Sequence, residues 1–258
     1  MARTHAHISI AGATKRFGDG DAMVHAFGPA SLDIGAGEFV SLLGPSGCGK
    51  STLLLMIAGL LPLSEGRIDV AGVTVRGVRT DVGVMFQDST LVPWRTVRGN
   101  VELQLELRGL PVSEYRERID ELLASVGLAD FADRRPYELS GGMQQRAAFC
   151  QAIVHRPPTV LLDEPLGKLD AMTRERIRAD LQELWRRTRP TVLLVTHSIE
   201  EAVQLSTRVC LITPRPGRLH GVIDIDLPWP RDTNVKKSTA FVRYVNEIGD
   251  VFRDYGVM

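Results

Sequence analysis

Gly44-Pro45-Ser46-Gly47-Cys48-Gly49-Lys50-Ser51 decides the fold of this chain. The segment fits the pattern G-x-x-x-x-G-K-[ST], in which glycine backbones curl around a phosphate and a lysine reaches its outer oxygens. An apolar run at 38–43 precedes it and a helical pattern at 51–61 follows, which is the strand–loop–helix context that the motif requires. The N–H groups and dipole at the start of that helix favour the same anion. The pattern predicts a nucleoside triphosphate site; the alternative is a glycine-rich turn without a ligand.

Three side chains in this segment have distinct expected roles. We expect Lys50 to reach the β- and γ-phosphates and Ser51 to ligate Mg²⁺. Cys48 has two interpretations: a thiol activated at a helix N-terminus, or a small side chain that fits the loop. The second is the simpler interpretation and the one we favour.

Composition limits the class of protein. The chain has 258 residues, of which 44% are apolar, so it can bury a full domain core. It carries 31 basic and 31 acidic residues, and this zero balance argues against a general nucleic-acid binder. The three cysteines are far apart, which indicates a reducing compartment. The longest apolar stretch, 53–63, is too short to span a bilayer, and the N-terminus has no signal-peptide pattern, so we expect a cytoplasmic chain.

The order of the expected elements predicts an α/β domain. Strand patterns at 159–162, 191–195 and 209–213 alternate with helical patterns at 172–188 and 199–205, which is typical of a mostly parallel sheet. Further strands are expected at 8–11, 30–34 and 82–86, and the mostly parallel sheet is expected to have an antiparallel part. The middle of the chain has helical patterns, including one at 113–126 that Ser113 can cap and Gly127 can end.

These patterns predict one domain with the P-loop NTPase fold and an inserted α-helical subdomain. The expected division is a core of 1–87 and 159–227, a helical subdomain of 88–158 and a C-terminal extension of 228–258. Within the extension, apolar residues at helical spacing over 240–255 predict a helix that packs on the core, although a regulatory role for that helix is the other interpretation.

A second acidic motif ends the strand that begins at Thr159. Asp163 can hold Mg²⁺ through a water, and Glu164 can polarise the attacking water. Because successive residues of an extended chain face opposite sides, we expect one acid to face the metal and the other the γ-phosphate. The alternative is an acidic strand end in solvent.

Two more segments can contact a phosphate. Ser140-Gly141-Gly142 opens a helix, which makes a second anion site by the same dipole argument. His197 follows an apolar strand, and a neutral histidine there can donate to a γ-phosphate oxygen. Taken alone, the first segment can be a turn and the second a polar strand end.

Together these motifs resemble the ATP-binding subunits of ABC transporters. Ser140-Gly141-Gly142 with Gln144 is similar to the ABC signature, Gln87 to the Q-loop glutamine and His197 to the switch histidine. Leu169-Asp170 resembles the end of the D-loop, and Phe17 matches the aromatic residue that stacks on adenine. The resemblance extends over about 8–227, with every motif in order.

The resemblance implies an ATPase that closes its sites with a second copy of itself. Its expected catalytic residues are Glu164, His197 and Gln87, and its Mg²⁺ ligands are Ser51, Gln87 and Asp163. The residues expected to hold ATP are Phe17, Gly44, Pro45, Ser46, Gly47, Cys48, Gly49, Lys50, Ser51 and Thr52. The residues expected to contact ATP bound to the other copy are Ser140, Gly141, Gly142, Gln144 and Asp170.

A narrower resemblance is to the ATPases of nitrate, sulfonate and taurine importers. It rests on Leu91-Val92-Pro93-Trp94 and on Pro214-Arg215-Pro216-Gly217-Arg218, although that group usually has no Val92 between the leucine and the proline. It implies that Leu91, Pro93 and Trp94 dock a helix of an integral membrane permease; the alternative for Trp94 is a core aromatic.

The importer resemblance also implies a place in the cell. We expect the chain on the cytoplasmic face of the inner membrane, with a periplasmic substrate-binding protein as an indirect partner and no nucleic-acid partner. Nitrate, taurine, alkane sulfonates and pyrimidine precursors all remain open as the solute.

The chain departs from the family pattern at Lys168, Gln151 and Ser198. Ser198 still forms an S-x-x-E capping box with Glu201. Lys168 adds a cation near the expected dimer interface and can alter turnover, while Gln151 has no evident role from sequence alone.

Two other function classes remain as alternatives. A soluble ABC ATPase acting on DNA or ribosomes usually has a long coiled-coil arm or two ATPase domains, and the 113-residue interval from Lys50 to Asp163 leaves no room for such an arm. A non-hydrolysing nucleotide-gated scaffold is suggested by Lys168 and Gln151, but intact Glu164 and His197 count against it.

Overall fold

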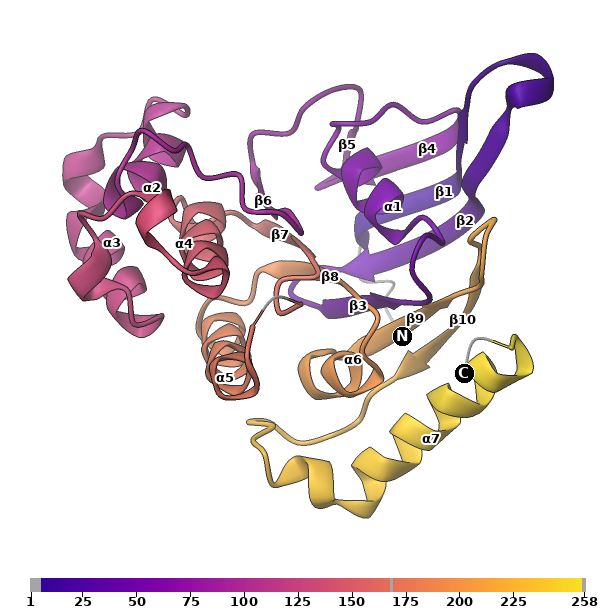
Figure 1. Ribbon diagram of the computed structural model, residues 1–258. Coiled ribbons are helices and arrows are strands. Elements are labelled where there is room, and N and C mark those ends of the chain that lie inside the picture. Colours follow the sequence, from indigo (N-terminus) through magenta and orange to yellow (C-terminus); the bar gives the residue numbers. More distant parts are fainter. Residues whose placement is uncertain (1–5, 168, 257–258) are drawn as a thin grey trace. The chain divides into compact units, whose positions relative to one another are not determined.

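The computed structural model describes residues 6–167 and 169–256. The chain forms two compact units (Figure 1). The unit that we call the core unit contains the residues up to Arg79 and those from Thr188 onward, and the helical unit contains Thr80–Arg187. The sequence assigns three elements of the helical unit to the α/β core, namely the strands 82–86 and 159–162 and the helix 172–188. In the structure they belong to the helical unit, because their contacts group them with that unit.

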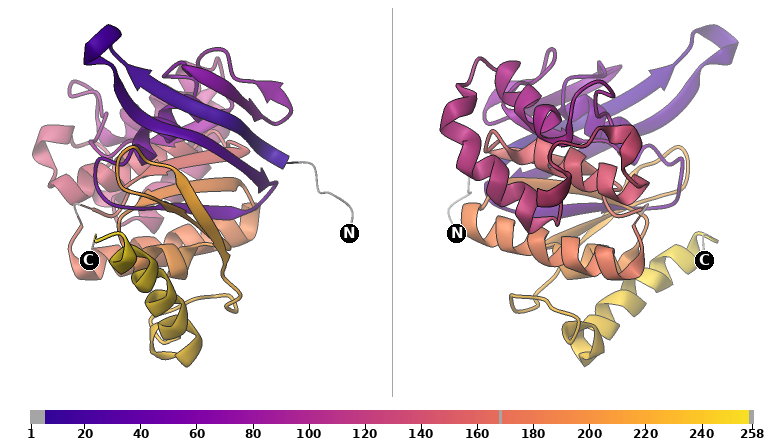
Figure 2. Two further views of the ribbon diagram at one scale, coloured as in Figure 1. Left: turned by 90° about the vertical axis from the view of Figure 1, so that its right-hand side faces the viewer. Right: turned by 60° about the vertical axis from the view of Figure 1, so that its left-hand side comes forward.

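An antiparallel sheet forms one layer of the core unit. Its strand order is β2-β1-β4-β5, and the pairing of Ile8 with Ile34 and of Ile10 with Leu32 places buried apolar residues of β1 and β2 opposite each other. The strands are β1 (Ala6–Phe17), β2 (Val24–Gly35), β4 (Glu65–Val70) and β5 (Val73–Thr74). The β1–β2 hairpin extends beyond its neighbours (Figures 1 and 2), and both strands are longer than the sequence pattern indicates.

A second sheet contributes four strands to the core unit, in the order β10-β9-β3-β8. They are β3 (Phe39–Leu43), β8 (Thr191–Thr196), β9 (Arg208–Ile212) and β10 (Leu219–Asp224). Every residue of β3 and β8 is buried, as expected for parallel strands covered on both faces. The two strands are parallel with Leu43 opposite Thr196, so the loop after β3 and His197 after β8 leave the sheet at the same edge.

Three α-helices complete the core unit, namely α1 (Lys50–Ile57), α6 (Ile199–Leu205) and α7 (Thr239–Asp254). In α7, the residues Phe241, Tyr244, Ile248 and Phe252 are buried in one cluster with residues of α6 and β9. Burial of each large apolar side chain is worth about 1.5–3 kcal/mol. Figure 2 shows the helix beside these elements, and the prediction that the C-terminal helix packs on the core is confirmed.

The buried guanidinium of Arg231 fixes the segment that leads to α7. Arg231 is 1% exposed, and it donates hydrogen bonds to the carbonyls of Val203, Ser206, Ile225 and Leu227 over 2.6–3.3 Å. Burial lowers the pKa of Arg231 to about 10, so the side chain remains charged at neutral pH. The bonds tie the C-terminal extension to the end of α6.

In the helical unit, the described residues form one parallel strand pair and four α-helices. The strands are β6 (Val82–Met85) and β7 (Thr159–Asp163), with Met85 opposite Leu162. The helices are α2 (Val97–Glu106), α3 (Arg116–Ser125), α4 (Gly141–Ile153) and α5 (Ala171–Thr188). Ser113 does not cap α3, because 112–115 form a 3₁₀ turn and the helix begins at Arg116; Gly127 does follow its end, at φ +68°.

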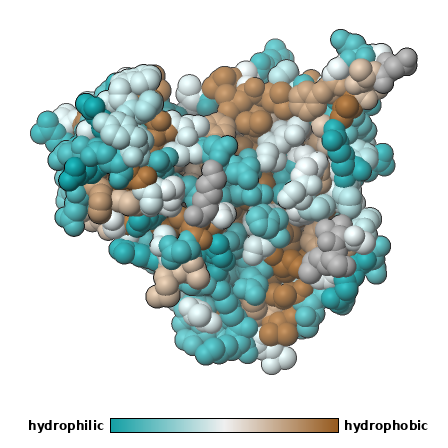
Figure 3. Space-filling model, viewed as in Figure 1, coloured by the Kyte–Doolittle hydropathy of each residue, from teal (hydrophilic) through white to brown (hydrophobic). Residues whose placement is uncertain are grey.

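Among residues 6–167 and 169–256, no helix has the length and hydropathy needed to cross a bilayer. Figure 3 shows a mostly hydrophilic face on which apolar residues gather over β4, β5 and the loop after them. The exposed large apolar residues there include Val73 and Val78.

Candidate active site

The phosphate loop lies in the core unit between β3 and α1, as the sequence predicts. Gly49 precedes α1 at φ +96°, and a Cβ there would come within 2.7 Å of the Ala26 carbonyl oxygen. A Cβ at Gly44 would come within 2.6 Å of the Ile212 carbonyl oxygen. Only glycine fits these two positions, so the loop has the close backbone packing that a phosphate cradle requires.

The Lys50 side chain lies folded over this loop. It is 5% exposed, and its Nζ donates to the carbonyl oxygens of Gly44 at 2.9 Å and Pro45 at 2.8 Å. These acceptors are neutral, and the anionic oxygens of a phosphate would add a Coulombic attraction for the ammonium group. Lys50 is therefore placed to exchange carbonyl oxygens for phosphate oxygens.

Cys48 is buried beneath the loop, 1% exposed, with its Sγ 3.8 Å from the Lys50 Nζ. Burial raises the pKa of the Cys48 thiol, which opposes thiolate formation. The burial of Cys48 therefore favours its interpretation as a small side chain that fits the loop.

The 214–218 segment packs against the same loop. A Cβ at Gly217 would come within 1.8 Å of the Cys48 carbonyl oxygen, so only glycine allows this approach, and the Gly28 N–H donates to the Gly217 carbonyl at 2.8 Å. This turn therefore supports the phosphate loop from one side.

Phe17, at the end of β1, is 44% exposed, and the Lys15 Nζ lies 5.0 Å from its ring centroid. An exposed aromatic ring of this kind offers a face on which a purine can stack. The structure keeps Phe17 available for the role that the resemblance implies.

His197 is exposed directly after β8, and Ser198 caps α6. The Ser198 Oγ accepts a hydrogen bond from the Glu201 N–H at 3.3 Å, as predicted. The predicted return bond, from the Ser198 N–H to the Glu201 carboxylate, is wrong. The Glu201 carboxylate accepts from the Thr196 hydroxyl at 2.8 Å, and the Ser198 N–H donates to that hydroxyl at 3.0 Å. Thr196 therefore links strand and helix around His197.

In the helical unit, Asp163 is the last residue of β7 and Glu164 follows it outside the strand. Glu164 has φ +46°, a left-handed conformation that is rare for a residue with a side chain and clusters at functional sites. The prediction that the two acids alternate along an extended chain is therefore wrong. Asp163 is 6% exposed and Glu164 is half-buried.

Gln87 and Glu164 are brought together. The Gln87 Nε2 donates to the Glu164 Oε2 at 3.1 Å, because the parallel pairing of β6 and β7 brings their carboxyl ends to one edge. Two residues that lie 77 positions apart in the sequence thus form one contact.

The Ser140-Gly141-Gly142 segment begins α4. The Ser140 Oγ accepts from the Met143 N–H at 3.3 Å, and both Ser140 and Gly141 are exposed. A Cβ at Gly142 would come within 3.1 Å of the Leu169 side chain. Gln144 is turned toward its own loop, since its Nε2 donates to the carbonyls of Pro136 at 2.9 Å and Leu139 at 3.4 Å.

Asp170 is exposed at the start of α5. Its carboxylate accepts from the Thr173 N–H at 3.0 Å, and hydrogen bonds from Thr173 lower the pKa of Asp170. This is a helix-capping role. Lys168, named above as a departure, lies outside the described residues.

Trp94 is 75% exposed, so the alternative of a core aromatic is wrong. The buried Asn100 holds the 91–96 loop. Its Oδ1 accepts from the Val92 N–H at 2.6 Å, and its Nδ2 donates to the carbonyls of Val92, Arg95 and Thr96 over 2.9–3.3 Å. Gln151 in α4 then donates to the Asn100 carbonyl at 3.1 Å, which gives this departure from the family a structural role.

The Asn100→Ala substitution is expected to lower the free energy of unfolding by about 3 kcal/mol, because it leaves buried peptide groups of the 91–96 loop without partners. Urea denaturation measures the loss. Asn234→Ala, at an exposed turn, is the control and should change stability by less than about 0.5 kcal/mol. Equal stability of the two variants would contradict the scaffold role of Asn100.

The donor set fits Mg²⁺ and a nucleotide. Among the described residues no three His, Cys, Asp or Glu side chains cluster as a metal cage. Mg²⁺ does not need one, since it is usually bound by one or two carboxylates, waters and substrate phosphates. In the core unit, the Ser51 hydroxyl at the start of α1 is a hard oxygen donor, and the glycine cradle and Lys50 fit a polyphosphate. In the helical unit, the Asp163 carboxylate at the end of β7 is a hard oxygen donor of the same kind.

Residues 27–167 match the protein family described as ABC transporter, which is more than half of the chain. The chain belongs to the ABC transporter family. It is 43% identical over 234 residues to the taurine import ATP-binding protein of Jannaschia sp., covering 87% of this chain and 85% of that one. It is 42% identical over 224 residues to the aliphatic sulfonates import ATP-binding protein of Bacillus licheniformis, covering 87% of each.

Solved structures of ABC cassettes share this fold. One, described as a dimeric post-hydrolysis state of an ATP-binding cassette bound to ADP and Pi, has a TM-score of 0.77 and 32% identity, and the match covers 86% of this chain and 100% of that one. The predicted fold class, a P-loop NTPase core with a helical insertion, is confirmed.

Proposed function

We propose that this ABC protein is the ATP-hydrolysing subunit of an importer that powers uptake of a small sulfonate-type solute through a partner permease. The hydrogen bond between Gln87 and Glu164 carries the proposal. Gln87 begins the segment that reaches the exposed Trp94 seven residues later, so a movement of the docking surface reaches the carboxylate that is expected to polarise water. The names of the taurine and sulfonate relatives support the solute class.

Each proposed catalytic group has one task. Lys50 and the N–H groups of the phosphate loop bind the phosphates, and Phe17 orients the adenine ring of ATP. Ser51, Asp163 and Gln87 would hold Mg²⁺, and the ion would supply charge neutralisation for the transferring phosphoryl group. Glu164 takes a proton from the attacking water, and His197 donates a hydrogen bond to the γ-phosphate.

A second copy of the chain is proposed to complete each site. One chain has one phosphate loop and one signature segment, and the start of α4 presents exposed Ser140 and Gly141. Together with Gly142, Gln144 and Asp170, these residues would contact ATP held by the other copy. The dimeric ADP- and Pi-bound cassette described above supports this arrangement.

The remaining partners follow from the importer assignment. A helix of the permease would dock on Leu91, Pro93 and Trp94 at the cytoplasmic face of the membrane. The chain would then be a peripheral subunit. A periplasmic binding protein would deliver the solute to that permease.

A phosphate-release assay separates the proposed ATPase from a non-hydrolysing scaffold. We expect the purified chain to release phosphate from ATP when Mg²⁺ is present. A scaffold would bind ATP and release no phosphate. A chain that hydrolyses ATP only when DNA or ribosomes are added would favour the soluble ABC ATPase instead.

The Trp94→Ala variant is expected to lower ATP-driven uptake of radiolabelled taurine by cells about 10-fold or more, since truncation of a central interface tryptophan typically costs 2 kcal/mol or more. Phosphate release by the purified chain should not change, because Trp94 touches no proposed catalytic group.

Leu107→Ala is the matched control for this substitution. Leu107 is 71% exposed and follows the far end of α2, about 15 Å along the helix from the 91–96 loop. Uptake should remain normal in this variant. Normal uptake in Trp94→Ala as well would contradict the docking role.

A further inference from the structure

The buried side chain of Gln145 has no partner among the described residues. Gln145 in α4 is 2% exposed, and neither its Nε2 nor its Oε1 makes a hydrogen bond with any described residue. Two other glutamines of the same helix differ: Gln144 donates to the Pro136 carbonyl at 2.9 Å, and the buried Gln151 donates to the Asn100 carbonyl at 3.1 Å. Because buried amides are nearly always paired, an unpaired one calls for a physical reason.

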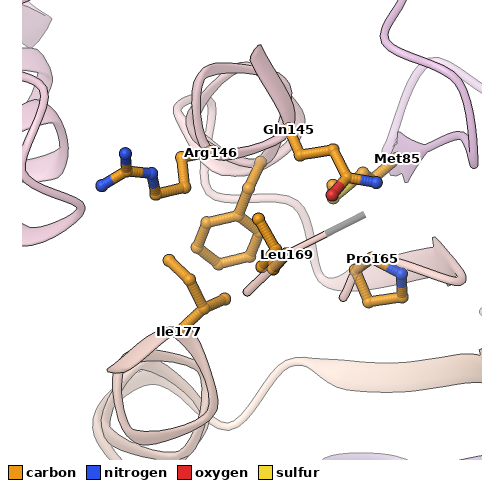
Figure 4. A pocket seen from close by; sticks show the side chains of 7 residues that line it. Met85, Gln145, Arg146, Pro165, Leu169 and Ile177 are labelled. Atoms are coloured by element: carbon orange, nitrogen blue, oxygen red, sulfur yellow. The ribbon is translucent and has the colours of Figure 1, made fainter. Parts of the chain in front are cut away.

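The Gln145 side chain lines a small hollow of about 10 Å³ that is partly open to solvent and lies within the helical unit. Figure 4 shows the side chain extended from α4 to the side of the hollow where Met85 lies, with Pro165 on the facing segment. The hollow is otherwise largely apolar, and its lining also includes Arg146, Phe149, Leu169 and Ile177.

The two wall segments of this hollow lead to the proposed catalytic pair. Met85 is the last residue of β6, two positions before Gln87, and Pro165 directly follows Glu164. β6 is the last strand in the order of its sheet, so within the described part of the chain its outer edge has no strand neighbour. The unpaired amide thus lies next to the backbone that changes position if Gln87 leaves Glu164 to reach a metal.

We propose that Gln145 is a positioning residue, whose amide bonds the main chain of residues 85–87 once Gln87 has left Glu164. The inference rests on the proposed function, because that departure belongs to the hydrolytic cycle. In the arrangement described here the amide has no partner among the described residues, and in the hydrolysis-competent arrangement it gains one. The signature helix α4 is thereby linked to the Gln87–Glu164 pair through a bond made in one state only.

Gln145→Met tests the proposal, because methionine has a similar size and no amide. Without nucleotide, the variant should melt about 2–10 °C above the unsubstituted chain, since a buried polar group that has no protein partner among the described residues is removed. The kcat for ATP hydrolysis should fall about 3- to 10-fold with KM for ATP unchanged, since the lost bond forms after binding.

Gln151→Met is the matched control on the same helix. This substitution removes an amide that has a partner, so the melting temperature should fall. A lower melting temperature in Gln145→Met would show that the Gln145 amide is already paired. An unchanged kcat in that variant would show that Gln145 positions no catalytic group. Either result overturns the inference. Failure of the proposed function is a separate result, the absence of phosphate release from the unsubstituted chain, and it would overturn both.

Discussion

Glu164→Gln is expected to lower kcat for ATP hydrolysis about 10²- to 10⁴-fold while ATP binding is retained. The amide is nearly isosteric with the carboxylate but cannot accept a proton from water. Its oxygen can still accept the hydrogen bond that the Gln87 Nε2 donates at 3.1 Å, so the contact between the two side chains survives. The substitution therefore removes the proton acceptor and leaves the local packing intact.

Phosphate release and a fluorescent-nucleotide titration measure the two halves of this expectation. Glu183→Gln is the control, because Glu183 is an exposed acid of α5 paired only with Arg186 among the described residues, and its rate should match that of the unsubstituted chain. Near-normal hydrolysis by Glu164→Gln would remove Glu164 from the catalytic role.

Lys50→Ala is expected to weaken ATP binding about 10- to 100-fold. A charge-assisted hydrogen bond is worth about 1.5–3 kcal/mol, and no other side chain of the loop carries a positive charge. Removal of the ammonium group also frees the carbonyl oxygens of Gly44 and Pro45, which can then bond to water at the open side of the loop. The fold of the loop should persist, because its tight glycine positions are unchanged.

Isothermal titration with ATP and Mg²⁺ measures this loss, with a circular dichroism spectrum to verify folding. Lys237→Ala, in the 3₁₀ turn before α7, is the control and should bind ATP normally. An unchanged affinity in Lys50→Ala would refute the phosphate-binding role of the loop.

The sequence is informative where burial is uniform. The five residues of β3 and the six of β8 are all buried, so their apolar runs are unmistakable and the loop after β3 is correctly placed. β10 has alternating half-buried and exposed residues, and β4 exposes its first three, so neither has a continuous apolar run and both are missed. Short, half-exposed strands depend on their neighbours more than on their own composition.

The site residues divide in the same way. Lys50, Ser51, Asp163 and His197 follow from local motifs, and the structure places each at the end of a strand or the start of a helix. The left-handed backbone of Glu164 does not follow, because it is set by the turn in which the Gly167 N–H donates to the Glu164 carbonyl. The roles of Asn100 and Gln145 do not follow from the sequence, because no local sequence pattern marks a polar residue as buried. The one available signal is an amide side chain at a position where the helical pattern calls for an apolar residue.

The interaction of Gln151 shows why single departures from a family pattern are hard to interpret. Its partner, the Asn100 carbonyl, is 51 positions away in the sequence, and both residues serve the loop that carries Trp94. Its role follows only from the packing of α2 against α4.

The central claim, an ATPase that powers a permease, is tested most directly by capture from native membranes. The Glu164→Gln chain held with ATP and Mg²⁺ is the bait, the Glu164→Gln/Trp94→Ala chain is the control, and mass spectrometry identifies what is bound. We predict recovery of a multi-span membrane protein with the first bait and its loss with the second. Recovery of soluble partners alone from an intact membrane fraction would contradict the importer assignment.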